Sequence, residues 1–124
     1  MQDNKRNIIV EKTVEFSLII IDFVELLETQ RKYVIAKQVL RSGTSVGANV
    51  REAQNAESKA DFIHKMKIAA KEADETEYWL ELCHISKHYP ECQELREKAS
   101  EISKILSKII SSSKAKHYSN SLPN

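Results

Sequence analysis

The sequence has 124 residues, of which 30% are charged and 41% are hydrophobic, and it contains only two glycines and two prolines. This composition favours long helices over a turn-rich β architecture, and the length suits one domain with its own hydrophobic core. The formal net charge of +1 excludes a strong overall attraction to nucleic acid or anionic lipid, so binding of either kind requires a local patch.

The first predicted helix runs from Asn7 to Gln30 and carries two lines of mainly apolar residues. The line that we assign to the core is Ile9, Thr13, Phe16, Ile20, Phe23 and Leu27. Its alternating four- and three-residue steps are typical of a helix in a bundle. A second line beside it is Val10, Val14, Ser17, Ile21 and Val24. One bundle core does not need this much apolar surface, and we therefore expect part of the helix to form a subunit interface.

The second predicted helix runs from Tyr33 to Ala56 and contains both glycines of the sequence. Its core face is Ala36, Leu40, Gly43, Gly47 and Val50, with Val39, Val46 and Ala53 beside it. A glycine inside a helix costs about 0.5–1 kcal/mol relative to alanine. We interpret Gly43 and Gly47 as a place where a neighbouring backbone comes close, and assign them with Val50 and Trp79 to a helix-packing or oligomer motif. The alternative is a break at Ser42–Thr44, which the continuous periodicity disfavours.

The third helix is expected to begin after Ser58, because Ser58 and Asp61 have the spacing of a capping box. Its core line is Phe62, Met66, Ala69, Ala73, Thr76, Leu80 and Cys83, with Trp79 at its flank. The run Tyr89–Glu91 predicts the end of this helix and the start of the fourth, since Pro90 is tolerated at a first helical position. The core line of the fourth helix is Leu95, Ala99, Ile102, Leu106 and Ile109.

Short connections between four helices predict an all-α, antiparallel up-down-up-down four-helix bundle. A long hairpin of two helices is the alternative, but the break at Pro90 and the cap at Ser58 divide the chain too evenly for it. We expect the bundle domain to cover residues 1–113. Residues 114–124 are almost without apolar side chains, and we expect them to form a mobile C-terminal tail.

Two carboxylate-x-x-histidine pairs, Asp61/His64 and Glu81/His84, resemble halves of a di-iron site. A bundle takes such pairs from two facing helices, whereas both of these lie on the third helix. The sequence also lacks a glycine-rich phosphate loop and any recognisable catalytic triad. We therefore expect no catalytic residues, no metal and no cofactor, and we expect that the protein is not an enzyme.

Cys83 and Cys92, together with His84 and His88, are side chains of the type that bind zinc. Pro90 interrupts this group and Cys83 belongs to a core line, so the four are not expected to converge. The two cysteines lack a CxxC spacing and are typical of reduced thiols in the cytosol.

The first six residues are polar and do not resemble a targeting signal. The longest apolar run, Leu18–Ile21, is far too short to cross a bilayer. We therefore expect a cytoplasmic protein without a membrane partner.

Lys37, Arg41 and Arg51 lie within about 80° of one another on the second helix and form a compact basic stripe. Such a stripe suits contacts with the phosphates of nucleic acid, which depend on salt. Within the chain, the alternative partners are acids of the third helix, namely Glu72, Glu75 and Glu77.

Two motifs, RSGTSVGANVREA at residues 41–53 and KEADETEYWL at residues 71–80, resemble the bacterial 23S rRNA intervening-sequence protein family. The resemblance extends from about Asn7 to Ser112. It implies a four-helix bundle that assembles as a homo-oligomer, with a ring-shaped pentamer as the expected form, encoded within or near insertions in large-subunit ribosomal RNA genes. It implies no known reaction. A related branch, the accessory variability determinant of diversity-generating retroelements, binds nucleic acid and a reverse transcriptase through a strongly basic surface.

Three functions are compared on these grounds. The first is an oligomeric module that binds RNA or DNA through repeated copies of the basic stripe. The second is a scaffold whose oligomer binds another protein through apolar surface. An enzyme is the third and least supported, because the metal-ligand patterns fail on geometry.

Overall fold

The computed structural model describes residues 7–121, which fold into four helices. These are α1 (Ile8–Thr29), α2 (Tyr33–Ala53), α3 (Lys59–Ile85) and α4 (Gln93–Ser121). No β-strand occurs among the described residues. The prediction of an all-α chain with four helices is therefore confirmed. Residues 1–6 of the expected domain and residues 122–124 of the expected tail lie outside the described part of the chain.

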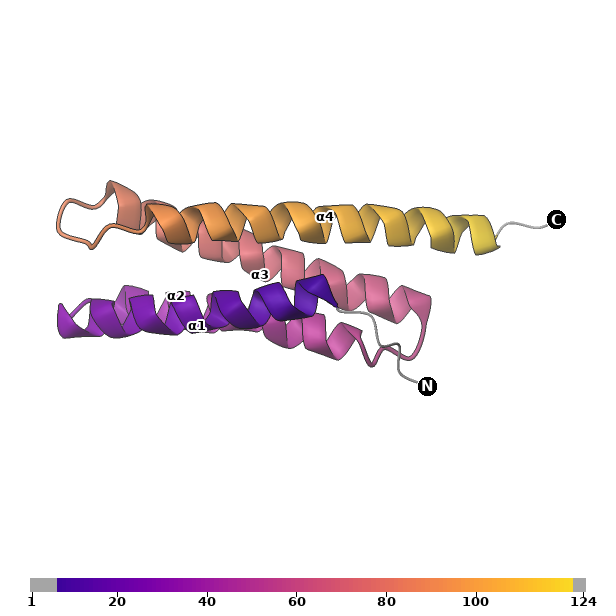
Figure 1. Cartoon of the computed structure of the whole chain (residues 1–124), viewed down its shortest axis with the longest axis horizontal. Coiled ribbons are helices and arrows are strands. Elements are labelled where there is room, and N and C mark those ends of the chain that lie inside the picture. The colour runs from indigo at the N-terminus through magenta and orange to yellow at the C-terminus, as the bar shows by residue number, and fades with distance from the viewer. Residues whose placement is uncertain (1–6, 122–124) are drawn as a thin grey trace.

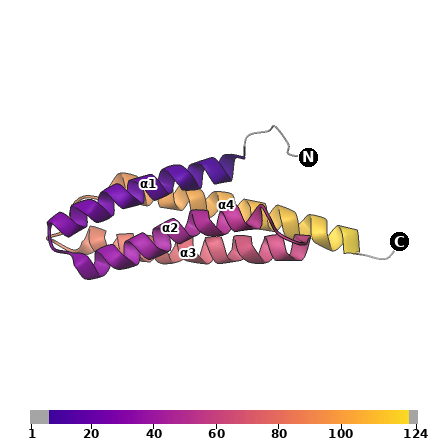
Figure 2. The same cartoon turned by 90° about the horizontal axis from the view of Figure 1, so that it is seen from below.

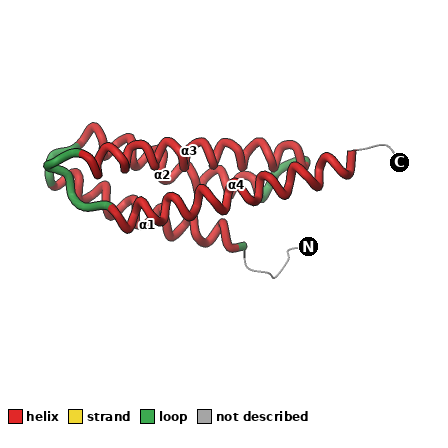
Figure 3. Tube along the Cα trace, turned by 90° about the horizontal axis from the view of Figure 1, so that it is seen from above, coloured by secondary structure: helices red, strands yellow, loops and turns green. Residues whose placement is uncertain are grey.

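The chain passes along the long axis of the molecule four times and turns back at each connection (Figure 1). Each helix packs against the next one in the sequence, and α4 also packs against α1. Views from below and above show α1 with α4 and α2 with α3 on the two sides of the molecule (Figures 2 and 3). The contact between α1 and α4 is the least extensive of the four. An ion pair of 2.6 Å between Lys12 Nζ and Glu101 Oε1 joins these two helices.

The core follows the predicted lines closely. All six residues of the line assigned to the first helix are buried, and α3 buries Met66, Ala69, Ala73, Thr76, Leu80 and Cys83. Phe62, the first residue of the line predicted for the third helix, is only partly buried, whereas its neighbour Ile63 is buried. The second helix differs from the prediction at Leu40, which is 39% exposed, whereas Val39 and Val46 are fully buried in its place. The core side of α2 is therefore turned toward α3 relative to the predicted face.

The starts of α1 and α3 are set by side-chain caps. The Ser58 hydroxyl accepts a hydrogen bond of 3.0 Å from the backbone N–H of Asp61, which confirms Ser58 as the N-cap of α3. The Asp61 carboxylate accepts a bond of 3.1 Å from the backbone N–H of Glu57. At α1, the Asn7 side chain accepts from the N–H of Val10. These bonds satisfy backbone donors that a helix leaves unpaired at its start.

Helix α2 continues without a break through both glycines, as predicted. A Cβ atom added at Gly43 would lie 2.9 Å from three side-chain carbons of Ile20. A Cβ atom at Gly47 would lie 3.3 Å from Thr13, including its carbonyl oxygen. The close approach that the glycines permit is thus made by α1 of the same chain.

Three predicted helix boundaries are wrong. Helix α2 ends at Ala53 rather than Ala56, because the N–H groups of the next three residues bond to carbonyls only three positions back. Helix α3 ends at Ile85 and α4 begins at Gln93, so Pro90 lies in the connection and not at a helix start.

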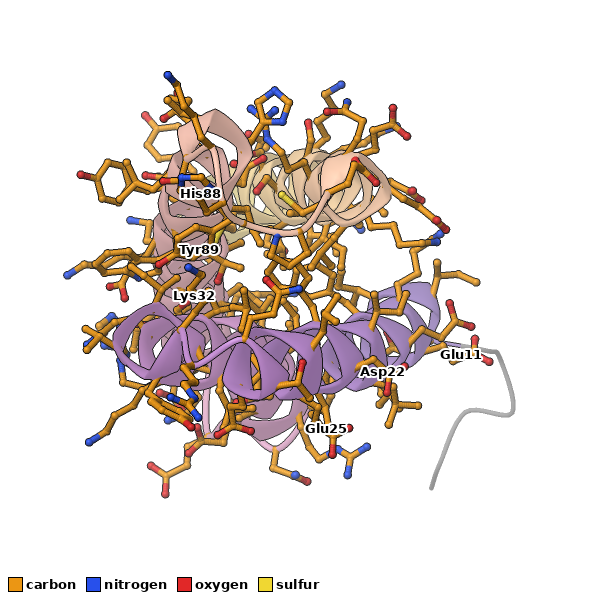
Figure 4. All side chains as sticks on the ribbon, turned by 90° about the vertical axis from the view of Figure 1, so that its left-hand side faces the viewer. Glu11, Asp22, Glu25, Lys32, His88 and Tyr89 are labelled. Atoms are coloured by element: carbon orange, nitrogen blue, oxygen red, sulfur yellow. The ribbon has the colours of Figure 1, made fainter. Side chains whose placement is uncertain are left out.

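The connection between α3 and α4 has its own anchors. The buried Cys92 places its Sγ atom 3.6 Å from the Leu80 carbonyl oxygen. The Lys32 ammonium group lies 5.0 Å from the centre of the Tyr89 ring, a cation–π contact that links this connection to the turn between α1 and α2 (Figure 4).

Helix α4 continues to Ser121, so residues 114–121 of the expected mobile tail are helical. Ser113 is buried, and Lys114 to Ser119 are exposed. The final turns project beyond the ends of the other helices (Figure 1). Lysine and alanine favour helix locally and no proline follows before residue 123, which explains a helix that outlasts its packed seam.

Candidate nucleic-acid interface

The basic stripe of the second helix is only partly available in the structure. The Arg41 guanidinium binds Glu72 on α3, with Nη1 3.2 Å from Oε2, and also forms an ion pair with Glu75. Arg41 therefore pairs with acids of the third helix, which was the alternative to contacts with phosphates. Lys37 and Arg51 are exposed, and neither forms an ion pair with any residue in the 7–121 part of the chain. They are too far apart along α2 to hold one phosphate between them, since 14 residues of helix rise by about 21 Å.

Trp79 is partly buried against the core and shares Glu75 with Arg41. Its indole Nε1–H donates to the Glu75 carboxylate at 3.1 Å. This hydrogen bond lowers the pKa of Glu75, with a smaller contribution from the Arg41 guanidinium, against the opposing effect of burial. Val50, another member of the predicted packing motif, is fully buried.

A buried polar contact beside these residues was missed by sequence reasoning. The Thr76 hydroxyl of α3 lies 2.9 Å from the Ser42 hydroxyl of α2, and the Ser42 hydroxyl donates to the Gln38 carbonyl at 3.0 Å. Ser42 is one of the small residues beside Gly43, and it was considered only as part of a possible helix break. The signal for this contact was the position of Ser42 on the side of α2 that faces α3.

The outward side of α1 carries exposed apolar side chains. We define the α1 outer face as Val14, Leu18 and Ile21, of which Leu18 is 58% exposed. Their spacing of four and three residues places them on one side of the helix, opposite the buried line. Leu40 of α2 is also exposed. Glu11 and Glu25 continue the same spacing at the two ends of the α1 outer face, and Asp22 is also exposed on this helix (Figure 4).

A second basic cluster lies where the start of α3 meets the end of α4. Lys67 of α3 and Lys114 of α4 are close enough for the ammonium group of Lys114 to lower the pKa of Lys67. Lys59 and Lys116 line a hollow nearby. The sequence alone does not bring these lysines together, because the two helices that carry them are far apart in the chain.

The predicted metal-ligand patterns do not come together. No group of three or more histidine, cysteine, aspartate or glutamate side chains within residues 7–121 is arranged to hold a metal ion. Cys83 and Cys92 are buried free thiols, whereas His84 and His88 are exposed. Burial raises the pKa of Cys83 to about 11 and also raises the pKa of Cys92.

Residues 5–108 match the family model described as 23S rRNA-intervening sequence protein. The chain belongs to this family. A crystal structure of a member of the S23 ribosomal protein family from Bacteroides thetaiotaomicron, described as a protein of unknown function, is 46% identical in sequence. The similarity covers 82% of this chain and 97% of that chain, with a TM-score of 0.78. No curated protein matches the chain.

In this member of the 23S rRNA-intervening sequence protein family, the two motifs that carry the resemblance contact each other. The motif of residues 41–53 supplies Arg41 and Ser42 on α2. The motif of residues 71–80 supplies their partners on α3, which are Glu72, Glu75 and Thr76. The motifs therefore hold α2 against α3, and the family resemblance predicted from them is confirmed.

None of the helices in the described part of the chain combines the length and the apolar character that crossing a bilayer requires.

Proposed function

We propose that this family member is a non-enzymatic, cytoplasmic homo-oligomer that associates with nucleic acid, and with RNA in particular. A pentameric ring is the expected form. The observation that carries the proposal is the α1 outer face, because a monomer gains nothing by exposing three large apolar side chains in one line.

A second copy of the chain is the occupant that best suits the α1 outer face. Its apolar line has acidic residues such as Asp22 and Glu25 at one border. On the neighbouring helix, Lys37 and Arg51 supply exposed positive charge. A surface that carries both signs of charge around an apolar strip is able to pair with another copy of itself.

Association with nucleic acid is supported by the family and by the exposed cations. One copy has a net charge of +1 and only isolated basic residues on α2, so its own affinity is expected to be low. An oligomer repeats each basic group around its circumference. Several weak phosphate contacts made at once then act with a high effective concentration.

A scaffold for another protein is the second candidate function, and the exposed apolar face also favours it. The two functions differ in what accompanies the oligomer. A scaffold is expected to retain a stoichiometric protein partner after nuclease treatment, whereas a nucleic-acid-binding oligomer loses its ligand.

The oligomer is tested by the mass of the nuclease-treated full chain in solution, measured by light scattering, for Leu18→Lys and Ile85→Lys. A lysine at position 18 lies within reach of Glu15 and Asp22, so the helix is expected to remain stable. A lysine at position 85 is the matched control, because Ile85 is an exposed residue in the last turn of α3, away from α1.

We expect an oligomeric mass for the parent and the Ile85→Lys control, and a smaller mass for Leu18→Lys. A monomeric parent contradicts the proposal. An unchanged mass for Leu18→Lys shows that the α1 outer face is not the subunit interface.

A further inference from the structure

The strongest unexplained feature is a pair of lysines that face each other across α3 and α4. Lys67 lies on α3 and Lys114 lies on α4, and the positive charge of each opposes the charge of the other. Two neighbouring ammonium groups repel each other, and an anion that binds both relieves this repulsion. The arrangement of the two helices thus favours negative charge at this place.

A hollow beside this pair extends the positive surface. It is lined by Lys59, Ala115, Lys116 and Ser119 and has a volume of about 370 Å³. Lys59 is the first residue of α3, and the partial positive charge of a helix N-terminus adds to its own. The lining contains two cations, one hydroxyl and no carboxylate.

Asp61, the acid in the first turn of α3, is already engaged. Asp61 accepts the backbone N–H of Glu57 and forms a long ion pair of 3.8 Å with Lys65. None of the lysines at positions 59, 67, 114 and 116 forms an ion pair with another residue of the described chain. Arg41, whose charge is neutralised by two glutamates, differs from them in this respect.

The charge changes sign along the same pair of helices. Toward the connection of residues 86–92, α3 and α4 form an open pocket of about 640 Å³. Its carboxylates are Asp74, Glu77, Glu81 and Glu97. An extended polyanion is repelled from this half and attracted to the other, so its position along the helices is limited to the lysine end.

We propose that Lys59, Lys67, Lys114 and Lys116 bind the phosphate backbone of a nucleic acid. This inference rests on the proposed function and names the surface that carries it. The ligand is a chain of phosphodiesters and not a single phosphate, because the four lysines belong to two adjacent places, one at the Lys67–Lys114 pair and one in the hollow.

The expected effect is a change in the salt dependence of binding. Each phosphate contact contributes about 0.7 to the slope of log affinity against log salt for a single strand, and about 0.9 for duplex DNA. Replacing Lys114 and Lys116 by glutamine removes at most two contacts from each copy of the chain. We therefore expect the slope to fall by up to about 1.4 for each copy that contacts single-stranded RNA or DNA, together with weaker binding at low salt.

The test measures binding of the full chain to labelled single-stranded RNA and single-stranded DNA of the same sequence over a series of salt concentrations. The variant is Lys114→Gln with Lys116→Gln, at exposed positions where glutamine preserves the helix. The matched control is Arg31→Gln with Lys87→Gln, which removes the same charge from the two connections at the opposite end of the molecule (Figure 1).

Lys67→Gln is a further variant, because it lies inside the packed length of α3 and does not depend on the projecting turns of α4. Lys37→Gln with Arg51→Gln tests the remainder of the stripe on α2. Equal slopes for RNA and DNA indicate backbone recognition, and a preference for RNA indicates an additional contact with the ribose hydroxyl.

The outcomes separate the two proposals. A parent chain that binds neither strand refutes the proposed function and this inference together. A parent that binds, with a slope unchanged in both Lys114→Gln/Lys116→Gln and Lys67→Gln, leaves the proposed function standing and overturns the lysine site. An equal fall in slope for the Arg31→Gln/Lys87→Gln control also overturns it, because the effect then follows total charge and not this surface.

Discussion

Replacing Gly43 by alanine is expected to strain the core even though alanine is the better helix former. The new Cβ atom would lie 2.9 Å from Cγ1, Cγ2 and Cδ1 of Ile20, where carbon atoms normally remain about 3.5–4.0 Å apart. Ile20 is fully buried, and its branched side chain has few rotamers to adopt. Overfilling a packed core costs about 1–3 kcal/mol, whereas exchanging glycine for alanine in a helix gains about 1 kcal/mol. The free energy of unfolding is therefore expected to fall by about 0–2 kcal/mol.

The strain is isolated by a control on the same helix. Ala48→Gly changes an exposed position of α2 and reports the helix-propensity difference alone. Urea denaturation followed by circular dichroism gives both values, at one fixed protein concentration so that self-association does not differ between the measurements. Reversing the sign of the Ala48→Gly effect gives the gain in unfolding free energy expected for Gly43→Ala without strain. The strain at Gly43 is the amount by which the measured value falls below this gain, and we expect about 1–3 kcal/mol. A shortfall of zero refutes the close packing of Gly43 against Ile20.

Three further predictions concern the α2–α3 contact and the buried thiol. Ser42→Ala removes the hydroxyl partner of Thr76 and is expected to lower the free energy of unfolding by about 1 kcal/mol in urea denaturation. Because burial raises the pKa of Cys83 to about 11, its thiol is expected to react with an aromatic disulfide reagent at pH 8 much more slowly in the folded chain than in urea. Trp79→Phe removes the donor that lowers the pKa of Glu75, so that pKa should rise toward its ordinary value in a carboxyl NMR titration. The stabilising effect of Glu75 is present above its ordinary pKa and is lost as the pH falls through the lowered pKa of the folded state. The variant is therefore expected to lose less stability in acid than the parent. The difference is small, because Glu75 and Arg41 are partly exposed and solvent screens their charges.

The sequence was sufficient where local chemistry decides the structure. The six-residue line from Ile9 to Leu27 needs only helical periodicity to be recognised, and all of it is buried. The Ser58 cap depends on residues three positions apart and was predicted for the same reason. The continuity of α2 through Gly43 and Gly47 also followed from a repeat that does not lose its phase.

Helix ends were harder to predict, because competing local signals decide them. Pro90 indicates a boundary, but the buried line of α3 is complete at Cys83 and the helix stops two residues later. At the other end, few apolar residues follow Ser113, yet the strong helix propensity of Lys114–Lys116 carries α4 onward. The lack of apolar residues indicated that this segment does not pack in the core, but it did not determine whether the segment is helical.

The candidate interface depends on distances between helices, which a sequence does not contain. Both outcomes for Arg41 were compatible with the sequence, and the register of α2 against α3 selects Glu72 and Glu75 as its partners. The approach of Lys67 to Lys114 arises from two helices joined only through a distant connection. The excess of apolar residues on α1 was easier to recognise, because it is a local property. Of the second predicted line only Val14 and Ile21 are exposed, whereas Val24 is buried in the core.

Most helices must both keep a helical backbone and pack one face into a core. The projecting final turns of α4 meet only the first of these requirements. The side chains of residues 114–119 are exposed, so their identity is free of the volume constraints that the core imposes on the turns before them. Lengthening, shortening or recharging this extension changes what the molecule attracts while the interior stays as it is. Ligand preference at this end is thus able to diverge between related chains that share one and the same scaffold.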